Sequence, residues 1–240
     1  MDGSGKSSPR PGRRRVLLIL IAAFFVFAIA IAGMATREPS NEYELVAGSG
    51  DSQRIFGGVR QLDDRLGEDG APVQIQLFLD AQSETYRDQF LETVPPLVNS
   101  QVRRGEIKLL YRNRSLTRNA TQLSFFGIEA AQNQGYGWQF AYLMFRNQDK
   151  AKQDGLDEEF LETIAGAIPN LEIPEWKEDF EAGLDPDSAM TTSLEDQDRL
   201  AIDLEIRDQP AAVVTGPDGT EVVQDAPDLG RLQQAIDSVR

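Results

Sequence analysis

The fold is decided by the run VQIQLFLDAQSETY, which extends from Val73 to Tyr86. Its first half alternates apolar and polar residues and becomes wholly apolar at Phe78 and Leu79, which predicts a strand that is buried on both faces at its end. The second half leaves this strand through Asp80 and enters a segment with the apolar spacing of a helix. The run therefore predicts a strand, a tight turn and a helix N-terminus, in that order.

The remaining pattern of residues 71–240 predicts an α/β domain. A helix is expected from about Ser83 to Ser100 and a second strand from Glu106 to Tyr111. The short strand–helix–strand connection makes these two strands parallel. Amphipathic helices follow over about residues 117–205. The chain then returns to a hairpin around the turn Gly216-Pro217-Asp218-Gly219 and closes with an amphipathic helix. The expected order is β–α–β, a helical block, and β–β–α.

Composition excludes several functions. The chain has neither cysteine nor histidine, so it offers no thiolate, no His-based catalytic triad and no zinc site of the usual kind. It cannot be a self-contained thiol–disulfide oxidoreductase. The formal net charge is −15, and the basic residues near the N-terminus leave the rest of the chain more acidic still. Because nucleic-acid phosphates repel such a surface, nucleic-acid binding is not expected.

An apolar run of twenty residues, Val16 to Ala35, follows the basic triplet Arg13-Arg14-Arg15. About twenty residues at ~1.5 Å rise each span a hydrocarbon core of ~30 Å. The basic flank predicts that residues 1–15 are cytoplasmic, that residues 16–35 cross the cell membrane once, and that the C-terminal domain is extracytoplasmic. A cleaved signal peptide, which gives a secreted protein, and a buried soluble helix are the alternatives. Residues 36–70 are polar and glycine-containing and are expected to form a flexible tether to the domain at 71–240.

The segments that carry a resemblance to a known family are Ala71–Asp80, Pro95–Leu97, Gly105–Arg112, the insertion-helix residues Glu129–Ala131 with Gly135–Phe145, and Gln209–Pro210. In this order and spacing the chain resembles the DsbA-like branch of the thioredoxin superfamily. There the first segment is the strand before the active site, and the second falls in the active-site helix. The third is the next strand, and the last holds a cis-proline that faces two cysteines. The resemblance implies a thioredoxin-like mixed sheet with an inserted helical subdomain, here preceded by one transmembrane helix.

The departures from that family concern its Cys-x-x-Cys pair. Ser83 takes the place of the attacking cysteine, Tyr86 that of the resolving one, and Glu84-Thr85 stand between them. Neither Ser83 nor Tyr86 can replace a thiolate in disulfide exchange. The resemblance therefore implies a redox-inactive member with no catalytic residue at Ser83, Glu84, Thr85 or Tyr86. One interpretation is that Ser83 is a helix N-cap and Glu84 a first-turn acid, which together stabilise the helix by ~1 kcal/mol.

The function that remains possible without thiols is binding. In the family the proline loop and the strand beside it can pair with an extended peptide through main-chain hydrogen bonds. The candidate peptide-binding residues are Ser83, Tyr86, Gln209, Pro210 and Ala211. We expect a protein- or peptide-binding or chaperone-like accessory module, with no cofactor and no metal. The alternatives are a glutathione-type transferase or isomerase, in which Ser83 stabilises a thiolate, and a structural remnant without a ligand.

Two charged regions complete the sequence. Residues 103–118 are rich in arginine and lysine, and residues 151–206 are strongly acidic. Solvated faces with some pairing between the two regions are the expected arrangement. A surface for a protein partner, or weak binding of a divalent cation, is the alternative.

Overall fold

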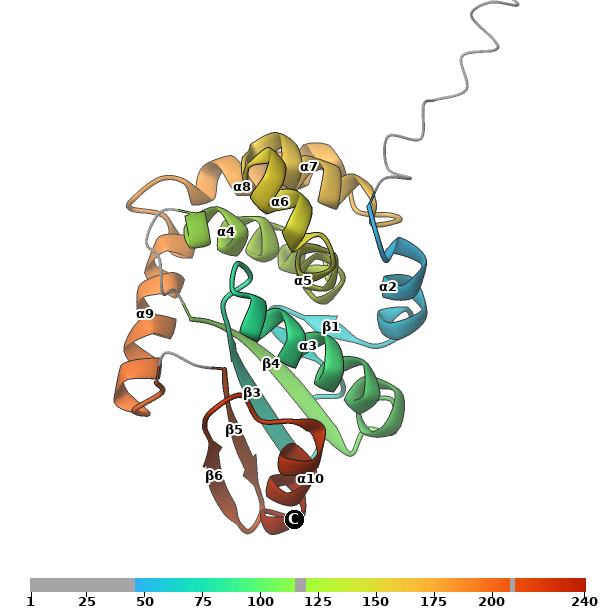
Figure 1. The fold of residues 1–240 in the computed structure, drawn as a ribbon, viewed down its shortest axis with the longest axis vertical. Helices are drawn as coiled ribbons and strands as arrows, with labels where there is room; N and C mark the ends of the chain where they lie inside the picture. Colours follow the sequence, from blue (N-terminus) through green and yellow to red (C-terminus); the bar gives the residue numbers. More distant parts are fainter. Residues whose placement is uncertain (1–45, 115–119, 208–209) are drawn as a thin grey trace, which may run out of the picture. The chain divides into compact units, whose positions relative to one another are not determined.

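Strand β3 (Val73–Leu79) is hydrogen-bonded on both sides, as its apolar composition predicts (Figure 1). It runs parallel to β4 (Ile107–Asn113) and antiparallel to β5 (Ala211–Gly216). The computed structural model describes residues 46–114, 120–207 and 210–240, and over these residues the sheet has the order β1-β2-β4-β3-β5-β6. The last strand, β6 (Gly219–Val223), pairs with β5 in the predicted hairpin. The predicted mixed sheet is confirmed.

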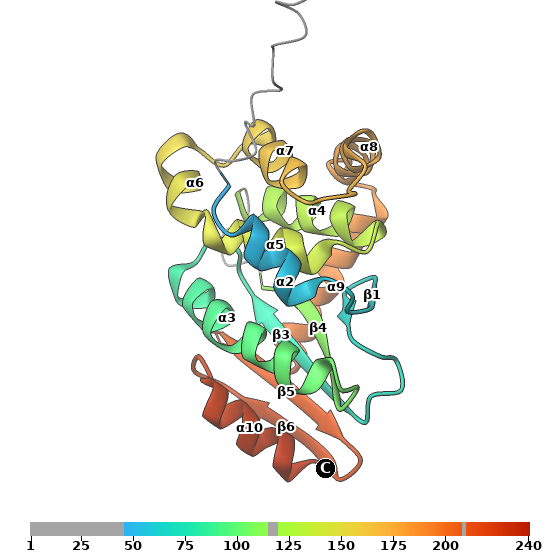
Figure 2. The ribbon, with the colours of Figure 1, turned by 90° about the vertical axis from the view of Figure 1, so that its right-hand side faces the viewer.

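Helices cover both faces of this sheet (Figures 1 and 2). Helices α3 (Glu84–Leu97) and α10 (Leu229–Ser238) lie on one face, and α9 (Ala189–Asp203) lies on the other. Alternate side chains of β3 serve two separate cores. Leu77 enters the larger core, on the side of α3. Phe78 belongs to a smaller core with Ala201 of α9, with Ile206, and with Ala211 and Val213 of β5.

The predicted helical subdomain is inserted between β4 and β5. Its aromatic rings form a continuous stack, because Trp176 lies 5.2 Å from Phe180 and 5.8 Å from Phe140, measured between ring centroids. Trp138 then joins the insertion to α3 through Phe90, at 6.2 Å. Besides α9, the insertion contains α4 (Ala120–Asn133), α5 (Gly137–Arg146), α6 (Gln148–Asp154), α7 (Glu158–Gly166) and α8 (Ile173–Gly183).

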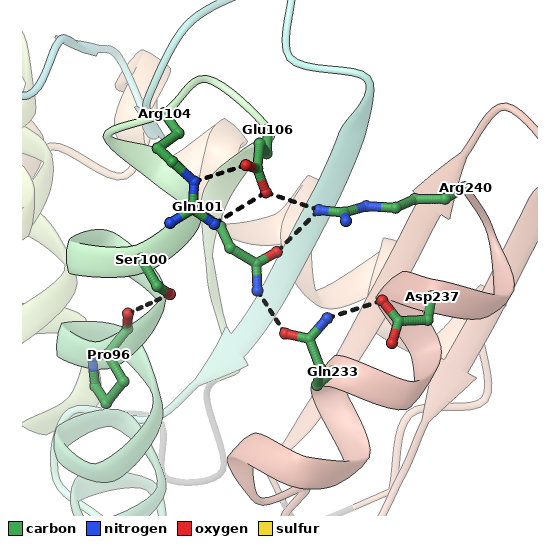
Figure 3. A network of polar contacts seen from close by, with 8 residues as sticks. All are labelled: Pro96, Ser100, Gln101, Arg104, Glu106, Gln233, Asp237 and Arg240. Carbon is green, nitrogen blue, oxygen red and sulfur yellow. Dashed lines mark hydrogen bonds and ion pairs between the residues drawn. The ribbon is translucent and has the colours of Figure 1, made fainter.

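A polar network ties α10 to the end of α3 (Figure 3). After Leu97 the helix continues as a π-helical turn, η2 (Val98–Val102). Gln101 in this turn donates to Gln233 of α10 and accepts a hydrogen bond from Arg240 at 3.1 Å. Arg240 also pairs with Glu106 at 3.1 Å. This ion pair is largely exposed, so it orients the C-terminal helix more than it stabilises the fold.

Residues 46–70 differ from the flexible tether that the sequence predicts. They form α2 (Ser49–Phe56) and a hairpin of β1 (Gln61–Leu62) and β2 (Arg65–Leu66), which extends the sheet beside β4. Phe56 and Leu66 are both 0% exposed, and the Phe56 ring meets Tyr142 edge-on at 5.8 Å. These buried side chains, together with the pairing of β2 with β4, hold this polar stretch against the domain. The domain therefore includes residues from 46 onward, not from 71.

The predicted transmembrane segment, residues 16–35, lies outside the described residues, as do its basic flank and the first part of the tether, up to residue 45. Within the part of the chain that the structure describes, no helix is long and apolar enough to cross a membrane.

The correction to residues 46–70 predicts that Phe56→Ala weakens the whole domain. Truncating a fully buried phenylalanine costs ~3–5 kcal/mol, because the lost contacts leave a cavity. The matched control is Leu62→Ala, since Leu62 is 48% exposed on the same segment and an exposed truncation changes stability by ~0.5 kcal/mol or less. Urea unfolding followed by tryptophan fluorescence measures both. If the two variants are equally stable, residues 46–70 behave as the flexible tether that the sequence predicts, and the correction is wrong.

Candidate functional site

The turn between β3 and α3 is built by Asp80. Its buried carboxylate accepts a hydrogen bond from the amide of Gln82 at 2.9 Å, and its carbonyl accepts one from the amide of Ser83 at 3.2 Å. Aspartate favours such turns because its short side chain can bond to the backbone two residues on. Helix α3 then begins at Glu84. The predicted order of strand, tight turn and helix is confirmed.

Ser83 occupies the N-cap position of α3, in the extended conformation with φ −90° and ψ 132°. Its hydroxyl, however, makes no capping hydrogen bond, so the predicted stabilisation by this side chain is wrong. Glu84 does lie in the first turn, where a negative charge is favoured. It forms an ion pair with Lys152 of α6, and the hydrogen bond from Lys152 lowers the pKa of the Glu84 carboxyl.

Three of the predicted peptide-binding residues are covered. Tyr86 is 1% exposed and belongs to the larger core, because the helix turns this position inward. Ala211 is buried opposite Phe78 in β5, which is an inner strand with neighbours on both sides. Pro210 is buried as well, and its carbonyl accepts a hydrogen bond from the amide of Ala226 at 2.8 Å. The side chains of these residues are therefore not accessible to a peptide, whereas pairing through their main chain stays a prediction.

Gln209 lies outside the described residues, and so does the peptide bond from Gln209 to Pro210, for which the resemblance implies the cis form. Of the predicted site, Ser83 is half-exposed, and Glu84 and Thr85 are exposed. The accessible surface of the site is thus the loop itself, not the strand beside it.

Helix α6 holds this loop from the side of the insertion. Gln148 donates through Nε2 to the carbonyl of Ala81 at 2.7 Å and to the carbonyl of Ser83 at 3.1 Å. Arg87 adds an ion pair to Asp149 of the same helix, at 3.2 Å. Sequence reasoning missed Gln148, since its partners lie 67 and 65 positions earlier in the chain and no local pattern marks it.

An apolar pocket of about 230 Å³ lies between the loop and the insertion. Gln148 is one of its lining residues, and the buried Oε1 atom of this side chain has no hydrogen-bond partner among the described protein atoms. The walls are mostly apolar, and Gln82, Gln148 and Lys152 are the polar residues among them. Its lining residues are Ala81, Gln82, Met144, Gln148, Ala151, Lys152 and Leu156.

A larger and more polar cleft, of about 570 Å³, is bordered by the β1–β2 turn, β4, α4 and α9. Arg112 lies in it, forms an ion pair with Asp64 and donates to the side chain of Gln76 at 2.9 Å. Burial raises the pKa of Glu129 to about 7, and the Asp64 carboxylate adds to this rise, whereas a hydrogen bond from Gln197 opposes it. A carboxyl that titrates near neutrality can exchange protons at physiological pH.

The basic and acidic regions of the sequence meet at one described ion pair, between Arg114 and Asp198 of α9 at 3.9 Å. Other basic side chains have partners outside the acidic region, as Arg103 has in the backbone carbonyls at the end of α2. Over the described ranges, no group of three or more acidic side chains is placed to hold a metal ion.

Comparisons with known proteins agree with this architecture. No family model matches the sequence. A curated relative, the "Probable disulfide bond formation protein D" of Bacillus anthracis, is 26% identical over 175 residues, which cover 72% of this chain and 76% of that protein. Oxidised BdbD from Bacillus subtilis superposes with a TM-score of 0.62 at 17% identity, over 75% of this chain and 96% of that chain.

Two further structures show the same fold. The α-DsbA1 protein of Wolbachia pipientis has a TM-score of 0.60 at 16% identity and covers 74% of this chain and 90% of its own. DsbA2 of Pseudomonas aeruginosa has a TM-score of 0.58 at 17% identity, and the match covers 75% of this chain and 95% of that chain. The chain has the DsbA-like thioredoxin fold, as the resemblance implies. It contains no cysteine at all.

The raised pKa of Glu129 predicts that Glu129→Gln stabilises the protein at high pH. The carboxyl titrates at about 7 when folded and near its ordinary value of 4.5 when unfolded. Between these values the folded state binds more protons than the unfolded state, so stability is lost as pH rises through 7. The glutamine side chain of the variant does not titrate, so this contribution to its stability does not change with pH. Its advantage is therefore near zero at pH 4.5 and grows to at most ~3 kcal/mol above pH 8.

Urea unfolding of both proteins at pH 5 and pH 8 measures this advantage. Glu195→Gln, at an exposed position of α9, is the matched control and is expected to give the same small difference at both values. An advantage of Glu129→Gln that does not grow with pH contradicts the raised pKa.

Proposed function

We propose that this chain is a membrane-anchored, extracytoplasmic binding module that interacts with protein segments and has no redox role of its own. The observation that carries the proposal is the accessible loop Gln82–Thr85. It keeps the strand–turn–helix geometry of the fold, yet the chain has no thiol. Disulfide exchange requires a thiolate as nucleophile, so the chain itself cannot perform it.

The proposed location rests on the sequence before residue 46. Val16–Ala35 is long enough to span a bilayer, and Arg13-Arg14-Arg15 favours a cytoplasmic N-terminus. The name of the Bacillus anthracis relative refers to disulfide bond formation, and disulfide bonds form in oxidising, extracytoplasmic compartments. Both observations support a domain that is held outside the cell membrane.

The proposed binding surface is the loop with its neighbouring pocket, not the buried residues of β5. Gln82 and Ser83 are half-exposed, Glu84 and Thr85 are exposed, and the pocket opens beside them. The rim charges of Glu84 and Lys152 neutralise each other, so the surface favours no strongly charged partner. An apolar pocket with few polar groups is the usual form of a binding site for an uncharged group.

A second candidate is a glutathione-type transferase or isomerase. The favourable observation is the Ser83 hydroxyl, which makes no capping hydrogen bond and stands at the N-terminus of α3, where a thiolate is stabilised. Lys152 borders the same pocket, and its ammonium group is engaged in an ion pair with Glu84. In this reaction Ser83 would only orient the thiolate of a bound thiol.

The proposed function predicts that a bulky residue in the loop blocks polypeptide binding. Thr85→Trp is expected to weaken the binding of a fluorescent, cysteine-free unfolded polypeptide by about tenfold or more, whereas Thr220→Trp, at an exposed position of β6, leaves it unchanged. Fluorescence anisotropy with the full chain in nanodiscs measures both. Ser83→Ala binds normally, because no step uses its hydroxyl.

The alternatives have distinct outcomes in the same experiment. A glutathione conjugation activity that Ser83→Ala abolishes would establish the transferase. If Thr85→Trp leaves binding intact, the binding surface does not include this loop. If the chain binds no polypeptide at all, the result favours the structural remnant without a ligand.

A further inference from the structure

The two outer strands of the sheet differ in how much main chain they leave open. Strand β1 consists of Gln61 and Leu62 alone, so it offers little main chain to a partner. At the other end, β6 is the last strand of the described sheet and pairs with β5 on one side (Figure 1). Its residues from Gly219 to Val222 are exposed. Such an edge is a template for another strand unless the protein protects it.

The register of the β5–β6 hairpin shows which main-chain groups of β6 face outward. A tight two-residue turn closes on a hydrogen-bonded pair, and such pairs recur at every second position of antiparallel strands. Glu221, opposite Val214, is in a hydrogen-bonding position, so its main chain faces β5. The N–H and C=O groups of Thr220 and Val222 therefore face outward. Over the described ranges of the chain, these groups have no hydrogen-bond partner.

The edge of β6 has few of the usual protecting features. Proteins commonly protect a free edge with proline, lysine or a β-bulge. Gly219–Val223 contain neither proline nor lysine, and their register with β5 is continuous. The open stretch ends at Gln224, whose carbonyl accepts a hydrogen bond from Arg231 at 2.8 Å. The edge is thus open to main-chain pairing, and its one charged side chain, Glu221, decides which partner it accepts.

A second copy of the chain is a poor partner for this edge. The symmetric antiparallel arrangement that uses all the outward groups pairs Thr220 of one copy with Val222 of the other. It places the two Glu221 side chains directly opposite each other, where like charges are destabilising. The formal net charge of −15 on each chain adds to this repulsion. Charge complementarity therefore favours a basic partner.

We propose that the edge of β6 binds an extended polypeptide segment with a lysine or arginine at its centre, as an added antiparallel strand. The main chain of the segment pairs with Thr220 and Val222, and its basic side chain stands opposite Glu221. An apolar residue is favoured opposite Val222, which is 40% exposed. This inference goes beyond the proposed function, because β5 separates the edge from β3 and its loop.

The first test uses short fluorescent peptides with the core Val-Lys-Thr. In the antiparallel direction, the lysine stands opposite Glu221, and only the valine and threonine amides face β6. A peptide that is N-methylated at the valine and threonine is therefore expected to bind the full chain in nanodiscs about tenfold more weakly than the unmodified peptide. A peptide that is N-methylated at the lysine is the matched control and is expected to bind normally. Equal binding of the two methylated peptides overturns the inference.

The second test reverses the charge of the edge. Glu221→Lys is expected to weaken binding of the Val-Lys-Thr peptide by about fivefold and to strengthen binding of a Val-Glu-Thr peptide by a similar factor. The matched control is Glu195→Lys, which changes the net charge equally at an exposed position of α9 and is expected to keep the preference for lysine. If both variants reverse the preference, the attraction is general and the inference is wrong.

The third test removes an outward amide of β6. Val222→Pro takes away an N–H that faces solvent, which an edge strand tolerates. It is expected to weaken binding of the Val-Lys-Thr peptide about tenfold, since a main-chain hydrogen bond is lost and its partner is left unpaired. Thr220→Trp keeps all the main-chain groups and is expected to bind normally. Far-ultraviolet circular dichroism checks that both variants are folded, and the methylated peptides test the same hydrogen bonds without any variant.

Failure of this inference differs from failure of the proposed function. Thr85→Trp is expected to leave binding of the Val-Lys-Thr peptide unchanged. If Thr85→Trp blocks this peptide, the peptide binds at the loop, which overturns the inference and keeps the proposed function. If the full chain in detergent forms dimers that Val222→Pro dissociates, a second copy occupies the edge, and the proposed occupant is wrong.

Discussion

The burial of β3 on both faces constrains the rest of the domain. A strand that becomes apolar and buried on both faces at its C-terminal end needs a hydrogen-bonded neighbour on each side and a covering layer on each face. Strands β4 and β5 supply the neighbours, α3 and α10 cover one face, and α9 covers the other. The helical insertion has to leave from β4 and return to β5, so it stands at the end of β3 where Asp80 begins the turn. The candidate site therefore lies at the edge of the sheet where β3 ends.

The loop keeps its shape without a covalent link. Asp80 holds it from within, through the amide of Gln82, and Gln148 holds it from the insertion, through the carbonyls of Ala81 and Ser83. The charge at the start of α3 is also balanced, since Glu84 is paired with Lys152. Such contacts are individually worth about 1 kcal/mol, but they act from two sides on a few residues. The geometry of the site therefore does not depend on the chemistry that thiols would bring.

Local patterns allowed most of the fold to be predicted. The alternation in Val73–Leu79 and the turn at Gly216–Gly219 are short-range signals, and the structure confirms both. Residues 46–70 were mistaken for a tether because the contacts that anchor them are made with residues far along the chain. Phe56 packs against Tyr142 of α5, Asn147 bonds to the backbone of Ala47, and β2 pairs with β4.

The candidate site was predicted less well, for a related reason. Ser83 and Glu84 stand at a helix start that the sequence reveals, but whether Tyr86 faces a groove or the core depends on packing against the insertion. The pocket is made by residues near 81 and near 148, so no local window contains it. Contacts between residues about 65 positions apart leave no periodic pattern in the sequence. Only the assembled fold therefore shows that Gln148 lies at the loop.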